Sequence, residues 1–214
     1  MSMRRFNGAD RMLIGFDTAL RTLFGRPQVT ERDNPATAVD EPEMSEDERD
    51  LAARLMRINH TGEVCAQALY QGQALTAKLP EIRDSMERAA KEENDHLDWC
   101  ETRLHELDSR KSLLNPFWYT GSFLIGAAAG LAGDKWSLGF VAETEHQVEA
   151  HLNEHIDRIP AQDRKSIAIL EQMKEDEIHH ATVALEAGGA ELPAAIKTAM
   201  KLSSKVMTKS VFYL

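Results

Sequence analysis

The sequence repeats one arrangement of side chains that can ligate metal ions. A glutamate followed three residues later by a histidine occurs on two predicted helices, and a single glutamate precedes each pair by 30 or 32 residues. Residues three apart on a helix project side by side. The six residues are Glu63, Glu93, His96, Glu145, Glu177 and His180. Carboxylate and imidazole ligands in this number suit a pair of metal ions held inside a bundle of helices.

The positions of these six residues on their predicted helices distinguish them from other acidic residues. On a 3.6-residue period, each falls within the apolar stripe of its helix. Glu145, for example, lies four residues after Val141 and three before Val148. Burying one ionised carboxylate without a partner costs several kcal/mol, and four in one core repel each other unless cations neutralise them. The sequence therefore predicts bound metal, the alternative being incidental surface or core residues.

A third glutamate–histidine pair shows that spacing alone is insufficient. Glu143 and His146 are rotated by about 140–200° from Val141, so we expect them to face solvent. His151 lies near the apolar stripe but outside the six-residue set, which leaves open a role in supporting the ligands or in electron transfer. The remaining histidines are expected at the surface or beside the ligands. They are His60, His105, His155 and His179.

The elements that must position these residues are helices separated by prolines. All seven prolines fall between apolar-periodic stretches, where a missing backbone donor is tolerated. We predict core helices near residues 46–78, 81–109, 117–132, 137–158, 161–187 and 193–212. The fold class is therefore all-α, a four-helix bundle with a long apolar crossover segment and an additional C-terminal helix.

The chain divides at residue 45. Residues 46–214 contain the predicted bundle, whereas residues 1–45 are expected to form an amphipathic helix at 10–24 and a flexible linker at 25–45 outside the core. The beginning of the chain lacks the apolar stretch and cleavage site of a secretory signal, so we expect no export.

Composition excludes several classes of protein. With 43% hydrophobic and 28% charged residues, the chain matches ordinary soluble proteins and not disordered or fibrous ones. A formal net charge of −10 would repel a phosphate backbone, so we expect no nucleic-acid partner. Cys65 and Cys100 have neither a disulfide-framework nor a zinc-site spacing, which fits a reducing cytosol.

Four segments around the predicted ligands resemble one known family. They are Arg-Ile-Asn-His-Thr-Gly-Glu at 57–63, Tyr-Gln-Gly-Gln at 70–73, Glu-Glu-Asn-Asp-His-Leu at 92–97 and Glu-Asp-Glu-Ile-His-His at 175–180. Together they make residues 46–214 resemble the demethoxyubiquinone hydroxylases, ferritin-like di-iron monooxygenases of ubiquinone biosynthesis. The resemblance implies that the six residues above hold two iron ions and are catalytic. It also implies hydroxylation, with O₂, of the ring of a polyprenyl methoxy-methyl-benzoquinol, demethoxyubiquinol.

The source of electrons is predicted to lie outside the chain. The sequence contains no Gly-x-Gly-x-x-Gly segment between a strand and a helix and no Walker motif. We therefore expect an external electron donor.

Residues 112–133 carry no charge, and their length approaches the ~20 residues needed to cross a bilayer. Polar residues and six small residues between 126 and 132 favour a crossover segment instead of a span. Burial against the bundle, with Gly126 and Gly130 allowing close packing, is one interpretation. The other is that an aromatic group embeds at a membrane interface. This group is Phe117, Trp118, Tyr119 and Phe123.

The last predicted helix carries lysines at four-residue spacing opposite an apolar face. They are Lys197, Lys201, Lys205 and Lys209. A basic amphipathic helix can lie on anionic lipid, although a solvated face of a bundle helix is the plainer interpretation. Because a polyprenyl tail does not readily leave the bilayer, we expect peripheral attachment at the cytoplasmic face of the cell membrane.

Two other functions share some of these features. A ferritin-type iron-binding or ferroxidase protein would use the same ligands but would not need the apolar segment at 112–133. A metal-free lipid-binding scaffold of a ubiquinone biosynthetic complex would need the apolar faces but not the ligands. Assembly into a homo-oligomer, or association with other ubiquinone biosynthesis proteins, is left open by the sequence.

Overall fold

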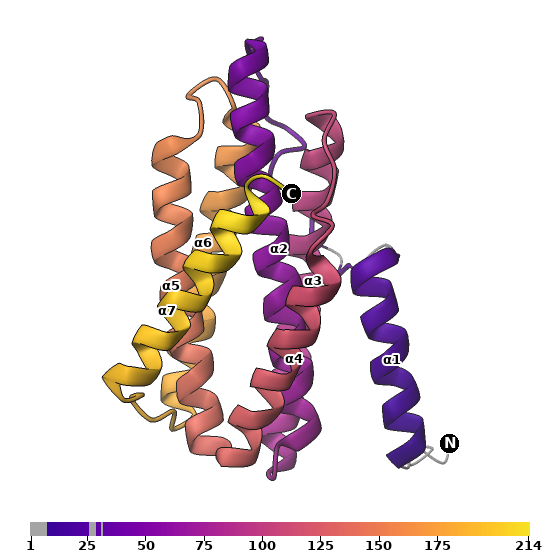
Figure 1. Ribbon diagram of the computed structural model, residues 1–214, viewed down its shortest axis with the longest axis vertical. Helices are drawn as coiled ribbons and strands as arrows, with labels where there is room; N and C mark the ends of the chain where they lie inside the picture. The colour runs from indigo at the N-terminus through magenta and orange to yellow at the C-terminus, as the bar shows by residue number, and fades with distance from the viewer. Residues whose placement is uncertain (1–7, 26–28, 31) are drawn as a thin grey trace.

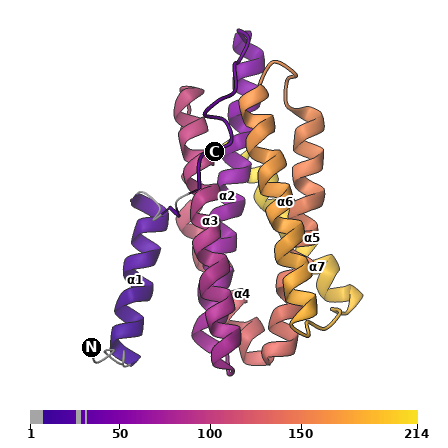
Figure 2. The same cartoon turned by 180° about the vertical axis from the view of Figure 1, so that it is seen from behind.

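The computed structural model describes residues 8–25, 29–30 and 32–214, and this part of the chain is helical without any strand. Its helices are α1 (Gly8–Phe24), α2 (Glu46–Thr76), α3 (Pro80–Glu106), α4 (Asn115–Ala132), α5 (Asp134–Arg158), α6 (Arg164–Glu186) and α7 (Ala194–Val211). Figures 1 and 2 show α2 and α3 beside α5 and α6, with α4 and α7 on one side of this bundle. The all-α prediction is confirmed, and each predicted helix is present with ends shifted by a few residues.

Local sequence explains where the helices begin and end. Ser45 caps α2 in a reciprocal capping box with Glu48. Pro80 begins α3, where a helix needs no backbone donor. After α6 the chain turns at Gly188, whose φ of +98° is accessible to glycine at little cost.

Two of the apolar clusters in the core form layers across the helices of the bundle. One layer contains Leu55 of α2, Trp99 of α3 and Leu170 of α6. The other layer crosses the bundle nearer its opposite end and contains Met86 of α3 and Val141 of α5. On each helix, the predicted ligands lie in the sequence between residues of one layer and residues of the other. Each layer therefore shields the ligands from water on one side.

The crossover helix α4 packs closely against α2. A Cβ atom on Gly126 would overlap the backbone of α2 at Leu69, and one on Gly72 would overlap the backbone of α4 at Phe123. Glycine at both positions lets the two helices approach, so the close-packing interpretation is confirmed. Tyr119 is buried, so it does not join Phe117, which is 68% exposed, on an outer surface. The membrane-interface interpretation therefore does not hold for Tyr119, whose hydroxyl donates to Gln71 of α2, and it stays a prediction for the other three aromatic residues.

The segment before α2 also departs from prediction. Residues 29, 30 and 32–45, here called the N-terminal strap, lie against the bundle, and Ala36 belongs to the first apolar layer. Arg32 bonds Asp95 of α3, and Glu41 bonds the buried Arg103 of α3. The expectation that residues 25–45 stay outside the core is therefore wrong for the strap. Polar long-range contacts hold this segment, and an apolar periodicity does not reveal them. The division of the chain into domains at residue 45 remains a prediction.

The outer helices expose apolar residues. On α4, Phe117, Leu124 and Leu131 are exposed, and on α7 Leu202 and Val206 are exposed. Three of the four lysines of α7 are exposed as well, whereas Lys197 is half-buried. Among the described residues, no helix is both long and apolar enough to cross a membrane.

Candidate metal centre

The structure brings all six predicted ligands together. Each is at most 7% exposed, and they come from α2, α3, α5 and α6. Their ligating atoms form two groups in which all the atoms lie within 4.8 Å of one another. One group is Glu63, Glu93, His96 and Glu177, and the other is Glu93, Glu145, Glu177 and His180. Glu93 and Glu177 belong to both groups, so the arrangement offers two adjacent cation sites with two shared carboxylates.

The two histidines are oriented alike, with Nδ1 facing the carboxylates. His96 Nδ1 lies 3.1 Å from Glu93 and 3.3 Å from Glu177. His180 Nδ1 lies 3.3 Å and 3.4 Å from the same two residues. This orientation leaves each Nε2 at the outer edge of the cluster.

Each outer Nε2 atom meets a carboxylate of the opposite helix. His96 Nε2 on α3 donates to Asp176 of α6 at 2.8 Å, and His180 Nε2 on α6 donates to Glu92 of α3 at 2.6 Å. A carboxylate only accepts, so each Nε2 carries a proton. Burial alone would lower the pKa of His96 and of His180, but the surrounding carboxylates outweigh it and raise both, so without a cation Nδ1 is protonated as well. A bound metal ion would take the place of the Nδ1 proton. Sequence reasoning missed Asp176 and Glu92. Their one signal is that each directly precedes a predicted glutamate ligand.

The electrostatics of the cluster call for cations. Burial raises the pKa of Glu63 and of Glu145 well above the usual range, and neighbouring carboxylates act in the same direction. Burial alone would also raise the pKa of Glu93, but the charges and hydrogen bonds of His96 and His180 outweigh it and lower that pKa. Buried Glu145 Oε2 has no hydrogen-bond partner, and buried Glu93 Oε1 has only the 3.3 Å contact with His180 Nδ1. Such carboxylate oxygens in a dry core fit a bound metal ion, which would neutralise them.

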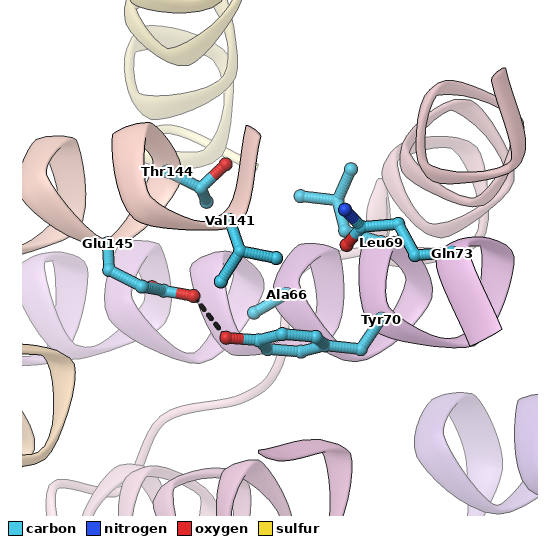
Figure 3. A pocket seen from close by; sticks show the side chains of 7 residues that line it. All are labelled: Ala66, Leu69, Tyr70, Gln73, Val141, Thr144 and Glu145. Atoms are coloured by element: carbon cyan, nitrogen blue, oxygen red, sulfur yellow. Dashed lines mark hydrogen bonds between the residues drawn. The ribbon is translucent and has the colours of Figure 1, made fainter. Parts of the chain in front are cut away.

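Tyr70 is a neighbour of the cluster to which the sequence analysis assigned no role beyond its place in the family-like segment 70–73. Its buried hydroxyl donates a short hydrogen bond to Glu145 Oε1, as Figure 3 shows. Burial raises the pKa of Tyr70, and the nearby carboxylates raise it further, so the hydroxyl keeps its proton. This bond occupies one oxygen of Glu145 and leaves Oε2 for a metal ion. A tyrosine seven residues after Glu63 on the same helix face was the available signal.

A surface pocket of about 140 Å³ reaches the cluster between α3 and α6. Met86, Ala89 and Val183 give it apolar walls, and Glu92 and His180 also line it. The pocket therefore offers small molecules a route to one side of the ligand cluster.

The other histidines lie away from the ligands. His60 and His155 are buried and bonded to asparagines, His60 to Asn115 and His155 to Asn59. They are thus neither at the surface nor beside a ligand, which corrects the expectation for these two. Burial lowers the pKa of His60 to about 3 and that of His155 to about 2. Both rings are therefore neutral core groups.

The four remaining histidines and Glu143 are also outside the cluster. The ring of His151 packs against that of His155, with centroids 3.9 Å apart and planes tilted by 56°, and burial lowers the pKa of His151 to about 4. Of the rejected third pair, His146 is exposed, and Glu143 is half-buried and bonded to Lys197 at 3.1 Å. His105 and His179 are exposed. The use of the apolar face to select ligands agrees with this outcome.

Comparisons with known proteins identify the family. The family model described as "Ubiquinone biosynthesis protein COQ7" matches residues 50–211. A protein of Nitrosococcus oceani named 3-demethoxyubiquinol 3-hydroxylase is 63% identical over the full length of both chains. Proteins with the same name from Acinetobacter baumannii and Acinetobacter baylyi are 58% and 57% identical over 99% of this chain and all of theirs. The chain therefore belongs to the COQ7 family of ubiquinone biosynthesis proteins.

Proposed function

We propose that this protein is a di-iron 3-demethoxyubiquinol hydroxylase that uses O₂ to hydroxylate the quinol ring during ubiquinone biosynthesis. The name of its relatives supplies the reaction, and the paired ligand groups supply the means. The observation that carries the proposal is the sharing of Glu93 and Glu177 between two groups of carboxylate and imidazole ligands.

Each residue of the cluster has a place in this proposal. Glu63 and His96 would hold one ion, Glu145 and His180 the other, and Glu93 and Glu177 would contact both. Imidazole and carboxylate ligands suit Fe(II), and a pair of iron ions, when bound, supplies the two electrons that O₂ activation needs.

The protein itself orients the ligands and excludes water. Asp176 and Glu92 keep the Nδ1 atoms of His96 and His180 turned inward, and Tyr70 fixes one oxygen of Glu145. The two apolar layers keep bulk water from the ligands along the bundle. An external electron donor completes the proposed reaction.

Peripheral attachment to the cytoplasmic face of the membrane is part of the same proposal, because the substrate carries a polyprenyl tail. It is supported by the apolar side chains that α4 and α7 expose. Both helices lie on one side of the bundle (Figures 1 and 2). Phe117 and Leu124 represent this surface on α4, and Leu202 and Val206 represent it on α7. Exposed Lys201, Lys205 and Lys209 on α7 would meet anionic headgroups.

The test is a single-turnover assay with the protein loaded anaerobically with Fe(II). Reduced protein, a short-tailed demethoxyubiquinol and ¹⁸O₂ should yield a hydroxylated quinol that carries one ¹⁸O atom, detected by mass spectrometry. Glu63→Ala should abolish the product, whereas Glu143→Ala, at the rejected third pair, should retain most of it. Oxidation and retention of iron without quinol product would instead indicate a ferroxidase. Fewer than about one iron per chain after loading would favour the metal-free scaffold.

A further inference from the structure

The N-terminal strap reaches the outer edge of one half of the metal centre. The backbone N–H of Thr30 donates to Asp95 Oδ1 at 2.6 Å, and its hydroxyl donates to Oδ2 at 2.5 Å. Arg32 Nε donates to the same Oδ2 at 2.8 Å. Asp95 is completely buried and directly precedes His96 on α3. The strap is therefore anchored next to a predicted ligand.

Arg32 also links two helices at this point. Its second nitrogen donates to Asp176 Oδ2 of α6 at 2.9 Å, and that oxygen also accepts from His96 Nε2 at 2.8 Å. The guanidinium carbon lies 5.0 Å from the centroid of Trp99, whose ring lies 5.4 Å from that of His96. Arg32 thus contacts two carboxylates and the aromatic ring that surround His96. A planar guanidinium can bond two carboxylates at once, which the point charge of a lysine does not reproduce.

The other half of the centre has no such clamp. His180 Nε2 bonds Glu92, whose side chain is 45% exposed, against 16% for Asp176. Among the described residues, no arginine or lysine bonds Glu92. The two half-sites therefore share the same kinds of ligands but differ in what holds the histidine.

We propose that Arg32 is a positioning residue for the half-site formed by Glu63 and His96. It fixes Asp176, which keeps His96 Nδ1 directed at the cation position, so the strap increases the affinity of this half-site for a divalent transition-metal ion. The inference rests on the proposed metal centre and assigns to the strap, which lies outside the span matched by the family model, a part in completing that centre.

The alternative is that the strap only anchors the N-terminal part of the chain. Glu41 provides the matched control, because it attaches the strap to Arg103 of α3 and contacts neither Asp95 nor Asp176. Asp163 remains bonded to Arg103 when Glu41 is changed. Glu41→Gln therefore loosens the strap without removing the clamp on His96.

The experiment measures Co(II) binding to apo-protein by equilibrium dialysis and by the visible absorption of bound cobalt. Glu145→Ala leaves the Glu63/His96 half-site intact, and Glu63→Ala leaves the other. In the Glu145→Ala protein, adding Arg32→Gln should lower the affinity of the remaining site for Co(II) about tenfold or more. Such a decrease is typical of losing a group that supports a metal ligand. Arg32→Gln should have a clearly smaller effect in the Glu63→Ala protein, where Arg32 acts on Glu92 through its charge but does not bond it. Arg32→Lys should restore only part of the affinity, and Glu41→Gln should change neither protein.

Several outcomes would overturn the inference. Equal weakening in both single-site proteins, or an equal effect of Glu41→Gln, would mean that the strap acts on overall stability. Unchanged affinity after Arg32→Gln would mean that Asp176 orients His96 unaided. If the unsubstituted protein binds no Co(II) and no Fe(II), the metal centre itself is refuted and the inference fails with it. Circular dichroism of each apo-protein checks that the variants fold.

Discussion

Substituting a shared glutamate should remove both metal ions, whereas substituting a terminal one should remove only one. Glu177 lies near both imidazoles, 3.3 Å from His96 Nδ1 and 3.4 Å from His180 Nδ1, and belongs to both ligand groups. Glu145 belongs to one group only. We therefore expect Glu177→Ala to lose the binding of both ions and Glu145→Ala to keep one.

The expected increase in Tm follows from the free energy by which bound metal stabilises the folded protein. An ion present at 100 times its Kd stabilises the fold by about 2.7 kcal/mol, so two independent ions add about 5.4 kcal/mol. For a chain of this size, about 2–4 °C of Tm corresponds to each kcal/mol. Loading should then raise Tm by about 11–22 °C in the unsubstituted protein, about half as much in Glu145→Ala, and not at all in Glu177→Ala.

The assay is anaerobic differential scanning calorimetry of each protein with and without Fe(II), alongside iron content and hydroxylation of a short-tailed quinol. Glu143→Ala is the control, because Glu143 lies on α5 two residues from Glu145 but bonds Lys197 outside the cluster. It should show the full increase in Tm. A full increase in Glu177→Ala, or its loss in Glu143→Ala, would refute the assignment of the shared ligands.

Three further predictions follow from other contacts. Tyr70→Phe leaves a buried carboxylate oxygen without its donor, so the apo-protein should lose about 2 kcal/mol and about 4–8 °C of Tm, and an unchanged Tm in calorimetry would contradict this. His155 has a folded-state pKa of about 2, below its unfolded value, so the unfolded chain binds the extra proton and stability falls as pH decreases below about 6.5. Between pH 6.5 and 5.5 this histidine should account for about 1 kcal/mol of the decrease in the free energy of unfolding. In urea unfolding, His155→Gln should therefore lose about 1 kcal/mol less than the unsubstituted protein over this range. Finally, Phe117→Ser with Leu124→Ser should reduce the part of liposome binding that salt does not reverse, and replacing the three exposed α7 lysines by Gln should reduce the salt-sensitive part by ~1 kcal/mol per lysine. Sedimentation with anionic vesicles that showed no change in either variant would refute a lipid-facing surface.

The exposure found in the structure decides which residues probe the membrane. From sequence, the aromatic residues at 117–119 and 123 formed one group. In the fold, Trp118 is half-buried, and Tyr119 and Phe123 pack in a cluster with Val64 and Ala68 of α2, so substituting these aromatic residues would disturb packing. Phe117 and Leu124 are 68% and 62% exposed and therefore test lipid contact with less effect on stability.

The sequence by itself determined the helices and the six residues that the fold brings into one buried cluster. Proline positions and helical periodicity are local properties, so the predicted ranges agree with the observed helices, and the apolar stripe separated Glu145 from Glu143 two residues away. The resemblance to a hydroxylase family agrees with the family match.

Only the tertiary structure decided which residues support the ligands. Asp176 and Glu92 act across the interface between α3 and α6, on histidines 80 and 88 residues away in the chain. Arg32 reaches Asp176 over 144 residues from a segment whose composition predicted a flexible linker. A helical period records which face of a helix is buried but not which neighbouring helix or segment meets it. The strap and the outer partners of the histidines therefore became apparent only when the packed helices brought these polar groups together.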